Sequence, residues 1–442
     1  MSGRPAGPRF LGISRLSLIS HAWRALLHRN FRLYFAGQSI SLVGNFMTQL
    51  ATRWLVYRMT HSVLLLGIVT FAGQIVSFLL GPMAGVWVER LNRRRLLVGT
   101  QAAAALQSLA MAALTLAHRI TLWEIIALAI LQGAINAFDM PGRQSFLVQM
   151  VDDRDDLRNA IAINSSMANG ARLIGPAIAG LLIGAVGEGW CFLLDGMSYF
   201  AVIASLLLMR IHLLTVARKR RGMVEQMREG WDYVRSYQPI RVILLLFALI
   251  CMMGYSFGVL LPVFASQILH GGATTLGWLM GASGIGALVS ALSLTLRKSI
   301  AGLTRMVQVS AAILGCALIL LGLSHVLWLS LIVMTLVGFG LMQCASASNT
   351  IIQSLVSEEM RAQVMSYFTM AFFGATPFGY LLAGAMAHWM GAPQTVIVTG
   401  SFCAAGAIWF SFHLKKIDVT VQHVELRSHE VKLAPEEQKQ AV

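Results

Sequence analysis

The sequence predicts an all-α membrane protein with twelve transmembrane helices in two pseudo-symmetric six-helix bundles. Composition is the first reason, because 57% of the 442 residues are hydrophobic and only 12% are charged, whereas a soluble domain carries roughly a quarter charged residues. The mean hydropathy is +0.69. The second reason is a series of apolar segments long enough to cross the ~30 Å hydrocarbon core of a bilayer. The third reason is a weak internal repeat.

The apolar segments follow one another along most of the chain, separated by short polar loops. Several exceed the roughly 20 residues needed to cross a bilayer, so we expect tilted helices or helices that extend beyond the membrane. The predicted spans lie near residues 33–57, 63–88, 96–117, 122–150, 160–185, 190–210, 240–268, 274–296, 304–324, 327–354, 362–389 and 393–413.

A single long polar segment in the interior divides these spans six and six. We expect a linker there that carries a short amphipathic helix around Glu225–Tyr237, and a polar, mobile tail after Lys416. The expected organisation is an N-terminal segment (1–30), a first bundle (31–210), the linker (211–239), a second bundle (240–414) and the tail (415–442).

The internal repeat relates the fourth and fifth spans of each half. Gly133 lies 18 residues before Val151, and Gly338 lies 18 residues before Val356. In both halves a short acidic loop follows, and then an apolar span with a proline in its middle. A shared period near 205 residues is typical of a duplicated six-span bundle, although chance similarity between apolar helices can also produce it.

The net charge of +15 is distributed as in a membrane protein and not as in a nucleic-acid-binding protein. Lysine and arginine gather in every second loop, which is the bias of cytoplasmic loops, and no aromatic and basic binding surface accompanies them. We therefore expect both termini in the cytoplasm and a multi-pass protein of the plasma membrane, in bacteria the inner membrane. The clusters include Arg90, Arg93, Arg94 and Arg95, the linker from Arg210 to Arg241, and Lys415 and Lys416.

The N-terminal segment does not resemble a cleavable signal peptide, and the cysteines do not suggest a cofactor. Residues 1–30 lack the uninterrupted apolar core of a signal peptide, and their apolar side chains recur at helical spacing. They form either a helix in the membrane interface or a disordered basic tail. The five cysteines lie in or beside apolar segments without a CxxC pair, so we expect no disulfide, metal or other cofactor.

Five ionisable residues inside predicted spans are candidates for a functional role, and all five lie in the first half. Each costs roughly 2.5–3.5 kcal/mol on insertion scales and therefore needs a reason. In a structural interpretation, Asp139 pairs with Arg143 or Arg172 and holds the fourth and fifth spans together. In a functional one, Asp139 exchanges a proton or competes with substrate for an arginine. The five candidates are Arg53, Asp139, Arg143, Arg172 and Asp195, of which Arg53 and Asp195 also fit interfacial snorkelling.

Uncharged polar residues in the spans form a second set of candidates. Polar side chains that face a bundle axis bind substrate or bond to one another. Gln38, Asn45 and Gln49 share one broad face of the first span, and Asn136 lies in the fourth.

The loop between the second and third spans carries a recognisable motif. It reads Gly-Val-Trp-Val-Glu-Arg-Leu-Asn-Arg-Arg-Arg from residue 85 and resembles the signature of the major facilitator superfamily. Glu89 replaces the usual Asp and Asn92 the usual Gly; Asn tolerates the left-handed backbone expected there. Gly85 is expected to allow close helix packing. The resemblance implies a latch between the two halves on the cytoplasmic side, formed by Gly85, Glu89, Arg90, Arg93 and Arg94. Ordinary positive-inside charge is the alternative.

The fifth span contains a glycine-proline pattern. It resembles a motif of exporters in the same superfamily, in which glycines allow close approach to a neighbouring helix and the proline bends the span. A generic small-residue packing helix is the alternative. The motif residues are Gly170, Gly175, Pro176 and Gly180.

The segment from Asn136 to Arg143 and the opening of the first span resemble exporters related to the enterobactin exporter and to multidrug efflux proteins. This resemblance implies a monomeric secondary transporter that exports a drug or siderophore, with protons as the coupling ion. Such exporters often have an acid after the glycine of span one, where this chain has Asn45. The proton-binding role must then lie on another residue, or the coupling differs.

Other functions stay open at this stage. An importer of the same fold, a lipid or lysolipid flippase, and a membrane receptor are each compatible with the pattern. No nucleotide-binding GxxxxGK[ST] loop and no HExxH or GxSxG motif occurs in the chain, so we expect neither ATP hydrolysis nor another enzyme activity. The expected partners are a small-molecule substrate, protons and membrane lipid.

Overall fold

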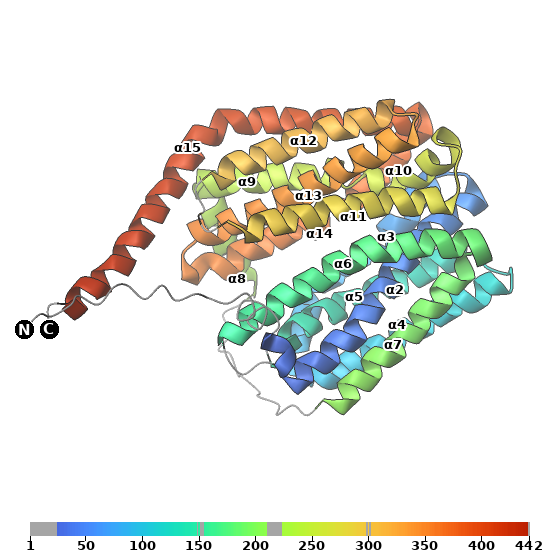
Figure 1. Ribbon diagram of the computed structural model, residues 1–442, viewed down its shortest axis with the longest axis horizontal. Helices are drawn as coiled ribbons and strands as arrows, with labels where there is room; N and C mark the ends of the chain where they lie inside the picture. The colour runs from blue at the N-terminus through green and yellow to red at the C-terminus, as the bar shows by residue number, and fades with distance from the viewer. Residues whose placement is uncertain are drawn as a thin grey trace, which may run out of the picture.

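The computed structural model describes residues 24–147, 149–150, 154–209, 223–297, 299 and 302–440. Within these ranges the regular structure is entirely helical (Figure 1). The first half consists of a short helix η1 (Arg24–Leu27) followed by α2 (Arg29–Thr60), α3 (Val63–Arg90), α4 (Arg93–Leu116), α5 (Leu122–Leu147), α6 (Arg154–Val186) and α7 (Glu188–Leu208).

The second half begins after a linker helix, α8 (Met223–Ser236). Its first span is one continuous rod made of α9 (Gln238–Leu249), the π-helical turn η2 (Ile250–Gly254), α10 (Phe257–Val263) and a second π-helical turn, η3 (Phe264–Ile268). The other elements are α11 (Ala273–Thr295), α12 (Leu303–Leu323), α13 (Leu327–Leu355), α14 (Glu358–Met390) and α15 (Ala392–Gln440).

Eleven of the described helical segments are long and apolar enough to cross a membrane. The twelfth span is α2, which is longer than most but contains Gln38, Asn45, Gln49 and Arg53. A helix with this many polar side chains is stable in a membrane only if they face protein or a water-filled cavity. The least apolar span is therefore the one expected near the centre of the molecule.

The connections between spans lie at two opposite ends of the molecule. We call the "loop end" the one with the short connections at 61–62, 117–121, 187, 269–272, 324–326 and 391. The "linker end" holds α8, and the far end of α15 also lies on this side (Figure 1). At the loop end, three histidines adopt the left-handed backbone at or near the ends of helices: His61, His118 and His270.

The two halves lie side by side and meet along two helix pairs, α3 with α14 and α6 with α11 (Figure 1). Glycines allow the close approach in both pairs. In the first pair Gly67 faces Tyr380 and Gly384, and in the second Gly180 faces Gly277. All of these residues lie in the halves of their helices nearer the loop end.

The chain after the last predicted span differs from expectation. We expected a mobile polar tail after Lys416, but α15 continues without a break to Gln440, and Figure 1 shows it leaving the second half as a long arm. A polar sequence without Pro or Gly at the junction does not end a helix. Most of the N-terminal segment, 1–23, lies outside the described residues, so its expected interfacial helix is not assessed.

Candidate functional site

Polar side chains of α2 lie at the centre of the molecule. The Gln49 side-chain amide donates to the Asn45 oxygen at 2.8 Å, and Gln49 is exposed while Asn45 is half-buried. Gln38, on the same face of α2, is instead buried, and neither polar atom of its side chain has a hydrogen-bond partner among the described residues. The face that the sequence predicts as one set is therefore divided between an open part and a buried part.

Two arginines of the first half lie at the junction with the second half. The Arg53 guanidinium is 6.0 Å from the ring centroid of Tyr380 on α14, and Gly258 of α10 lies beside it. The Arg172 guanidinium is 5.8 Å from the ring of Phe46 on α2 and within electrostatic range of Tyr255, which follows η2. Among the described residues neither arginine forms an ion pair, so both remain able to attract an anion.

Asp139 and Arg143 form an ion pair within α5. The Arg143 Nε is 2.5 Å from Asp139 Oδ2, and α5 remains helical through Pro141. The other carboxylate oxygen accepts from Thr100 at 2.9 Å and from Gln101 at 2.7 Å, both on α4. The alternative pairing of Asp139 with Arg172 is wrong, because Arg172 points toward the junction of the halves while Asp139 lies buried between α4 and α5.

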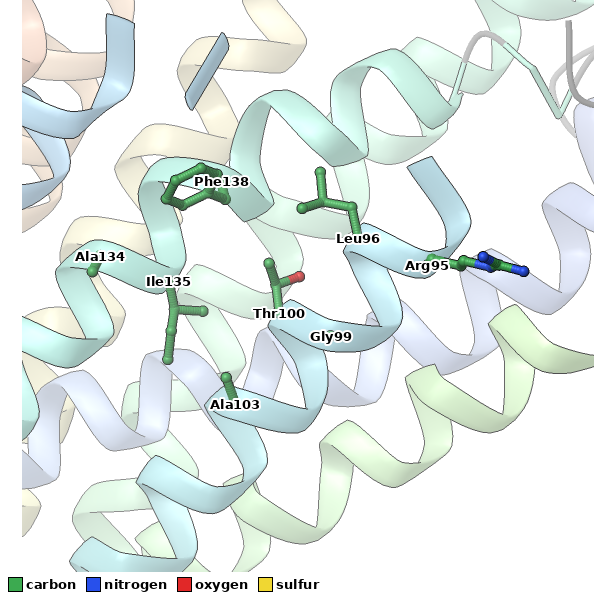
Figure 2. A pocket seen from close by; sticks show the side chains of 8 residues that line it. All are labelled: Arg95, Leu96, Gly99, Thr100, Ala103, Ala134, Ile135 and Phe138. Atoms are coloured by element: carbon green, nitrogen blue, oxygen red, sulfur yellow. The ribbon is translucent and has the colours of Figure 1, made fainter. Parts of the chain in front are cut away.

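The same two helices form a shallow, almost wholly apolar groove (Figure 2) of about 360 Å³. Arg95, Leu96, Gly99, Thr100 and Ala103 of α4 line one wall, and Ala134, Ile135 and Phe138 of α5 line the other. Thr100 brings a hydroxyl to this groove, and that hydroxyl is the one bonded to Asp139. The groove offers no second polar group to a ligand beyond Arg95 at its edge.

Asp195 on α7 is buried, 1% exposed, and differs from Asp139 in its partners. Its Oδ2 accepts from the Thr48 hydroxyl of α2 at 2.9 Å and from the Ser108 hydroxyl of α4 at 2.8 Å. Its Oδ1 has no hydrogen-bond partner among the described residues. No arginine, lysine or histidine of the described residues forms an ion pair with it.

The surroundings of Asp195 connect it to the open face of α2. Tyr199, one turn further along α7, lies beside both Asp195 and Asn45. Gly44 makes room for the carboxylate, because a Cβ there would lie 2.8 Å from Asp195 Oδ1. A chain of polar groups thus runs from exposed Gln49 through Asn45 and Tyr199 to the buried carboxyl group.

Asn136 lies on α5 away from these groups. It is exposed and accepts from the Gln132 side chain at 3.1 Å, one turn earlier in the helix.

Two arginines of the loop motif after α3 form hydrogen bonds with other helices of the first half. Arg93 donates to the Ser145 carbonyl of α5 at 3.3 Å, and Arg94 donates to the Leu207 carbonyl of α7 at 2.5 Å. Asn92 is not left-handed as expected. Its φ is −65°, and its side chain caps α4 by accepting from the Arg95 amide at 3.2 Å. Asparagine is a favoured N-cap, which explains the departure from glycine. The side chains of Glu89 and Arg90 lie outside the described part of the chain.

The expected close packing at Gly85 is also absent in this conformation. Among the described residues, no atom of another element lies within 4 Å of a Cβ built at Gly85, and the same holds for Gly81 one turn earlier. The reason is that this part of α3 stands apart from the second half, whereas Gly67 near the loop end is in contact with it.

The glycine-proline span, α6, is continuous through Pro176. Gly175 packs against Phe46 and Val43 of α2, and Gly180 packs against α11, where the Thr274 hydroxyl donates to its carbonyl at 3.1 Å. Gly170 has no neighbouring atom within 4 Å and so does not serve close packing here.

The residues that the sequence did not single out are hydroxyl and aromatic side chains. Thr48, Ser108 and Tyr199 surround Asp195, and Tyr255 and Tyr380 face the two arginines. No spacing rule identifies them, because serine, threonine and tyrosine are common in apolar helices and only the packing of distant spans brings them together.

Comparison with known proteins supplies the family. A family model described as transmembrane secretion effector matches residues 20–441. The staphyloferrin A transporter of Staphylococcus aureus is 27% identical over 394 residues, covering 88% of this chain and 98% of that protein. The multidrug efflux pump Tap of Mycolicibacterium fortuitum is 26% identical, covering 80% and 88%. Macrolide efflux protein A of Streptococcus pyogenes is 19% identical, covering 89% and 99%.

Solved structures agree on the fold. A bacterial homologue of the human lysosomal transporter Spinster, in an inward-facing and occupied conformation, aligns with a TM-score of 0.67 at 14% identity, covering 91% of this chain and 98% of that one. The nucleoside transporter NupG aligns with a TM-score of 0.65 at 14% identity, covering 88% and 99%.

Proposed function

Because this chain belongs to the major facilitator superfamily, in the family described as transmembrane secretion effectors, we propose that it exports a small amphipathic organic molecule by proton-coupled alternating access. The relatives are transporters, not enzymes, and they include a siderophore transporter and drug and macrolide efflux proteins. They support the export of small molecules.

The main support for alternating access is the contact between α3 and α14, which we call the seam. This contact is close toward one end of the molecule and open toward the other. Gly67, Phe71, Phe78, Gly81 and Gly85 recur at helical spacing on one face of α3. The first three contact α14: a Cβ at Gly67 would lie 2.8 Å from the Tyr380 carbonyl, Phe71 packs edge-on to Phe378, and Phe78 touches Gly374. In the described part of the chain, Gly81 and Gly85 have no neighbour within 4 Å of a built Cβ. The halves are thus joined toward the loop end and separated at the linker end.

A rocking motion of the halves would reverse this difference. Closing the linker end requires another helix to approach α3 closely at Gly81 and Gly85, where the missing side chains leave room. The positive-inside distribution of arginine and lysine supports a cytoplasmic linker end. The structure then corresponds to the conformation that receives cargo from the cytoplasm.

Asp195 is the group that we propose to carry the proton. A buried carboxyl group surrounded by hydroxyls, without a cation, is costly when ionised and readily protonated. The titratable groups beside it are Cys191 and Tyr199 on its own helix. Helices α2 and α4 contribute the uncharged Thr48 and Ser108. Arg143, which acts on Tyr199 from a distance, is already paired with Asp139.

Asp139 is proposed to have a structural role instead. Its ion pair and its two hydrogen bonds from α4 satisfy both carboxylate oxygens. Protonation would break a buried pair and leave Arg143 uncompensated, which is strongly unfavourable. The stable arrangement holds α4 and α5 together in either conformation of the transporter.

The two unpaired arginines and their aromatic neighbours favour an amphipathic cargo with an acidic group. Arg53 and Arg172 supply positive charge at the junction of the halves, while Phe46, Tyr255 and Tyr380 supply apolar and aromatic surface. Sites for small organic ligands combine such apolar walls with a few charged groups.

A flux assay in everted membrane vesicles tests the direction of transport. Respiration makes the interior of these vesicles acidic, so an exporter coupled to protons accumulates its substrate inside. The compounds to screen are a siderophore, a macrolide and an amphipathic dye. Accumulation that is abolished by a proton ionophore supports the proposal; uptake only into right-side-out cells would instead identify an importer.

Substitution at the seam tests alternating access. Gly85→Leu has space in this conformation but obstructs closure of the linker end, so we expect normal folding and loss of transport. Gly170→Leu, at another glycine without neighbours, serves as the matched control and should retain transport. Full transport by Gly85→Leu would contradict the proposed movement.

A further inference from the structure

A second cavity lies at the linker end, outside the group of polar residues around Arg53 and Arg172. It has a volume of about 610 Å³ and is walled by α8, α9 and α14, with Phe78 of α3 at its edge. This volume lies within the range of ~300–1,000 Å³ that small-molecule sites occupy. Among the described lining residues Phe78 is the single one from the first half, so the cavity lies at the boundary between the halves.

The linker helix α8 is a fixed wall of this cavity. Gly230 lies directly against Gln363 and Tyr367 of α14, which a side chain at that position would prevent. The Tyr367 hydroxyl donates to the Met227 carbonyl at 2.7 Å, and the Gln363 amide donates to Glu229 at 3.3 Å. Trp231 and Tyr367 also pack with ring centroids 5.9 Å apart. These contacts hold the segment between the halves against α14.

The lining combines apolar surface with positive charge alone. Trp231, Leu245, Met370 and Phe378 are large apolar side chains that remain exposed. The charged lining residues are Arg235 and Arg241. Arg241 donates one N–H to the Arg235 carbonyl at 3.0 Å, which orients its guanidinium at the end of α8 and leaves other N–H donors for a ligand.

We propose that this cavity is a loading site for the cargo, an amphipathic molecule whose apolar body covers the aromatic wall and whose acidic group reaches Arg235 and Arg241. An apolar body alone would leave the two arginines unmatched, and a small inorganic anion would leave the aromatic wall in water. Because α3 moves relative to α14 in alternating access, the site exists while the linker end is open. The assignment of the ligand as cargo rests on the proposed export function. The binding of an amphipathic anion in the cavity does not depend on that function.

Cysteine protection measures occupancy at the site itself. Ala371→Cys places a thiol in the cavity, and Ala103→Cys places one in the groove of Figure 2, which is the matched control because both alanines are half-buried beside apolar walls. Exposed Cys316 is replaced by serine in both. The full chain in nanodiscs of phosphatidylcholine is alkylated with a maleimide, with or without a probe.

The probes are anilinonaphthalene sulfonate and its uncharged analogue phenylnaphthylamine. We expect the anionic probe to slow alkylation of Ala371→Cys several-fold more than the neutral probe does, and to leave alkylation of Ala103→Cys unchanged. When Arg235→Gln is added to Ala371→Cys, the two probes should slow alkylation equally. Equal protection by both probes, or no protection, would overturn the site. Slower alkylation without probe in discs that contain phosphatidylglycerol would identify the occupant as a lipid and overturn the cargo assignment. None of these results depends on transport.

Discussion

Asp139 and Asp195 are buried carboxyl groups of the first half that have opposite kinds of partner. Asp139 has a guanidinium at 2.5 Å and two further donors. Asp195 has two hydroxyls on one oxygen and no partner on the other. The difference teaches that burial alone does not mark a working acid in a membrane protein. We propose that the presence or absence of a cationic partner separates the acid that holds the fold from the acid that exchanges a proton.

The largest expected effect is that of Asp195→Asn. An amide fills the same space and accepts the same hydroxyl hydrogen bonds but cannot carry a proton, so uphill export should fall to background. Counterflow, which exchanges cargo without a proton gradient, should continue at a rate near that of the parent. Measuring both in the same vesicle preparation separates lost coupling from lost folding, and loss of both activities would contradict the coupling role.

Asp139→Asn should damage the fold rather than the coupling. It leaves Arg143 buried without its counter-charge, and removal of one partner of a buried pair costs roughly 3 kcal/mol or more. We expect a lower thermal midpoint in detergent and less protein in the membrane, with uphill export per molecule largely retained. The double variant Asp139→Asn with Arg143→Gln should recover much of the stability; a stable single variant without uphill export would reverse the assignment of the two acids.

A smaller effect is expected from Ser108→Ala. The Ser108 hydroxyl donates to Asp195 and so favours its ionised form. This hydrogen bond stabilises the ionised form by about 1 kcal/mol. Its loss should move the pH at which export is half-maximal upward by roughly 0.7 of a pH unit. The pH profile of export checks this shift. Ser166→Ala, which removes a hydroxyl bonded only to its own helix, is the control and should leave the profile unchanged.

The fold was largely predictable because length, hydropathy and loop charge act along the sequence. The predicted twelve helices, their division into two bundles and the family resemblance are all confirmed. The end of α15 was not predictable, since no Pro or Gly between residues 417 and 434 requires the helix to stop.

The site was less predictable because it depends on which spans lie next to one another. The sequence identifies Asp139, Arg143, Arg172 and Asp195 as unusual, but Arg143 and Arg172 were equally good partners for Asp139 until the helices were placed. Thr48, Ser108 and Tyr199 carry no signal of their own. Gly85 and Gly170 were expected in close packing, but no atom of the described residues lies within 4 Å of a Cβ built at either position.

Cargo-driven proton movement tests the coupling claim most directly. Purified protein is reconstituted in liposomes that contain a pH-sensitive dye, and a gradient of a compound identified in the vesicle screen is imposed. The account predicts that the parent and Asp139→Asn move protons against the cargo, whereas Asp195→Asn transports cargo without any change of internal pH. Proton movement by Asp195→Asn at the rate of the parent would contradict it.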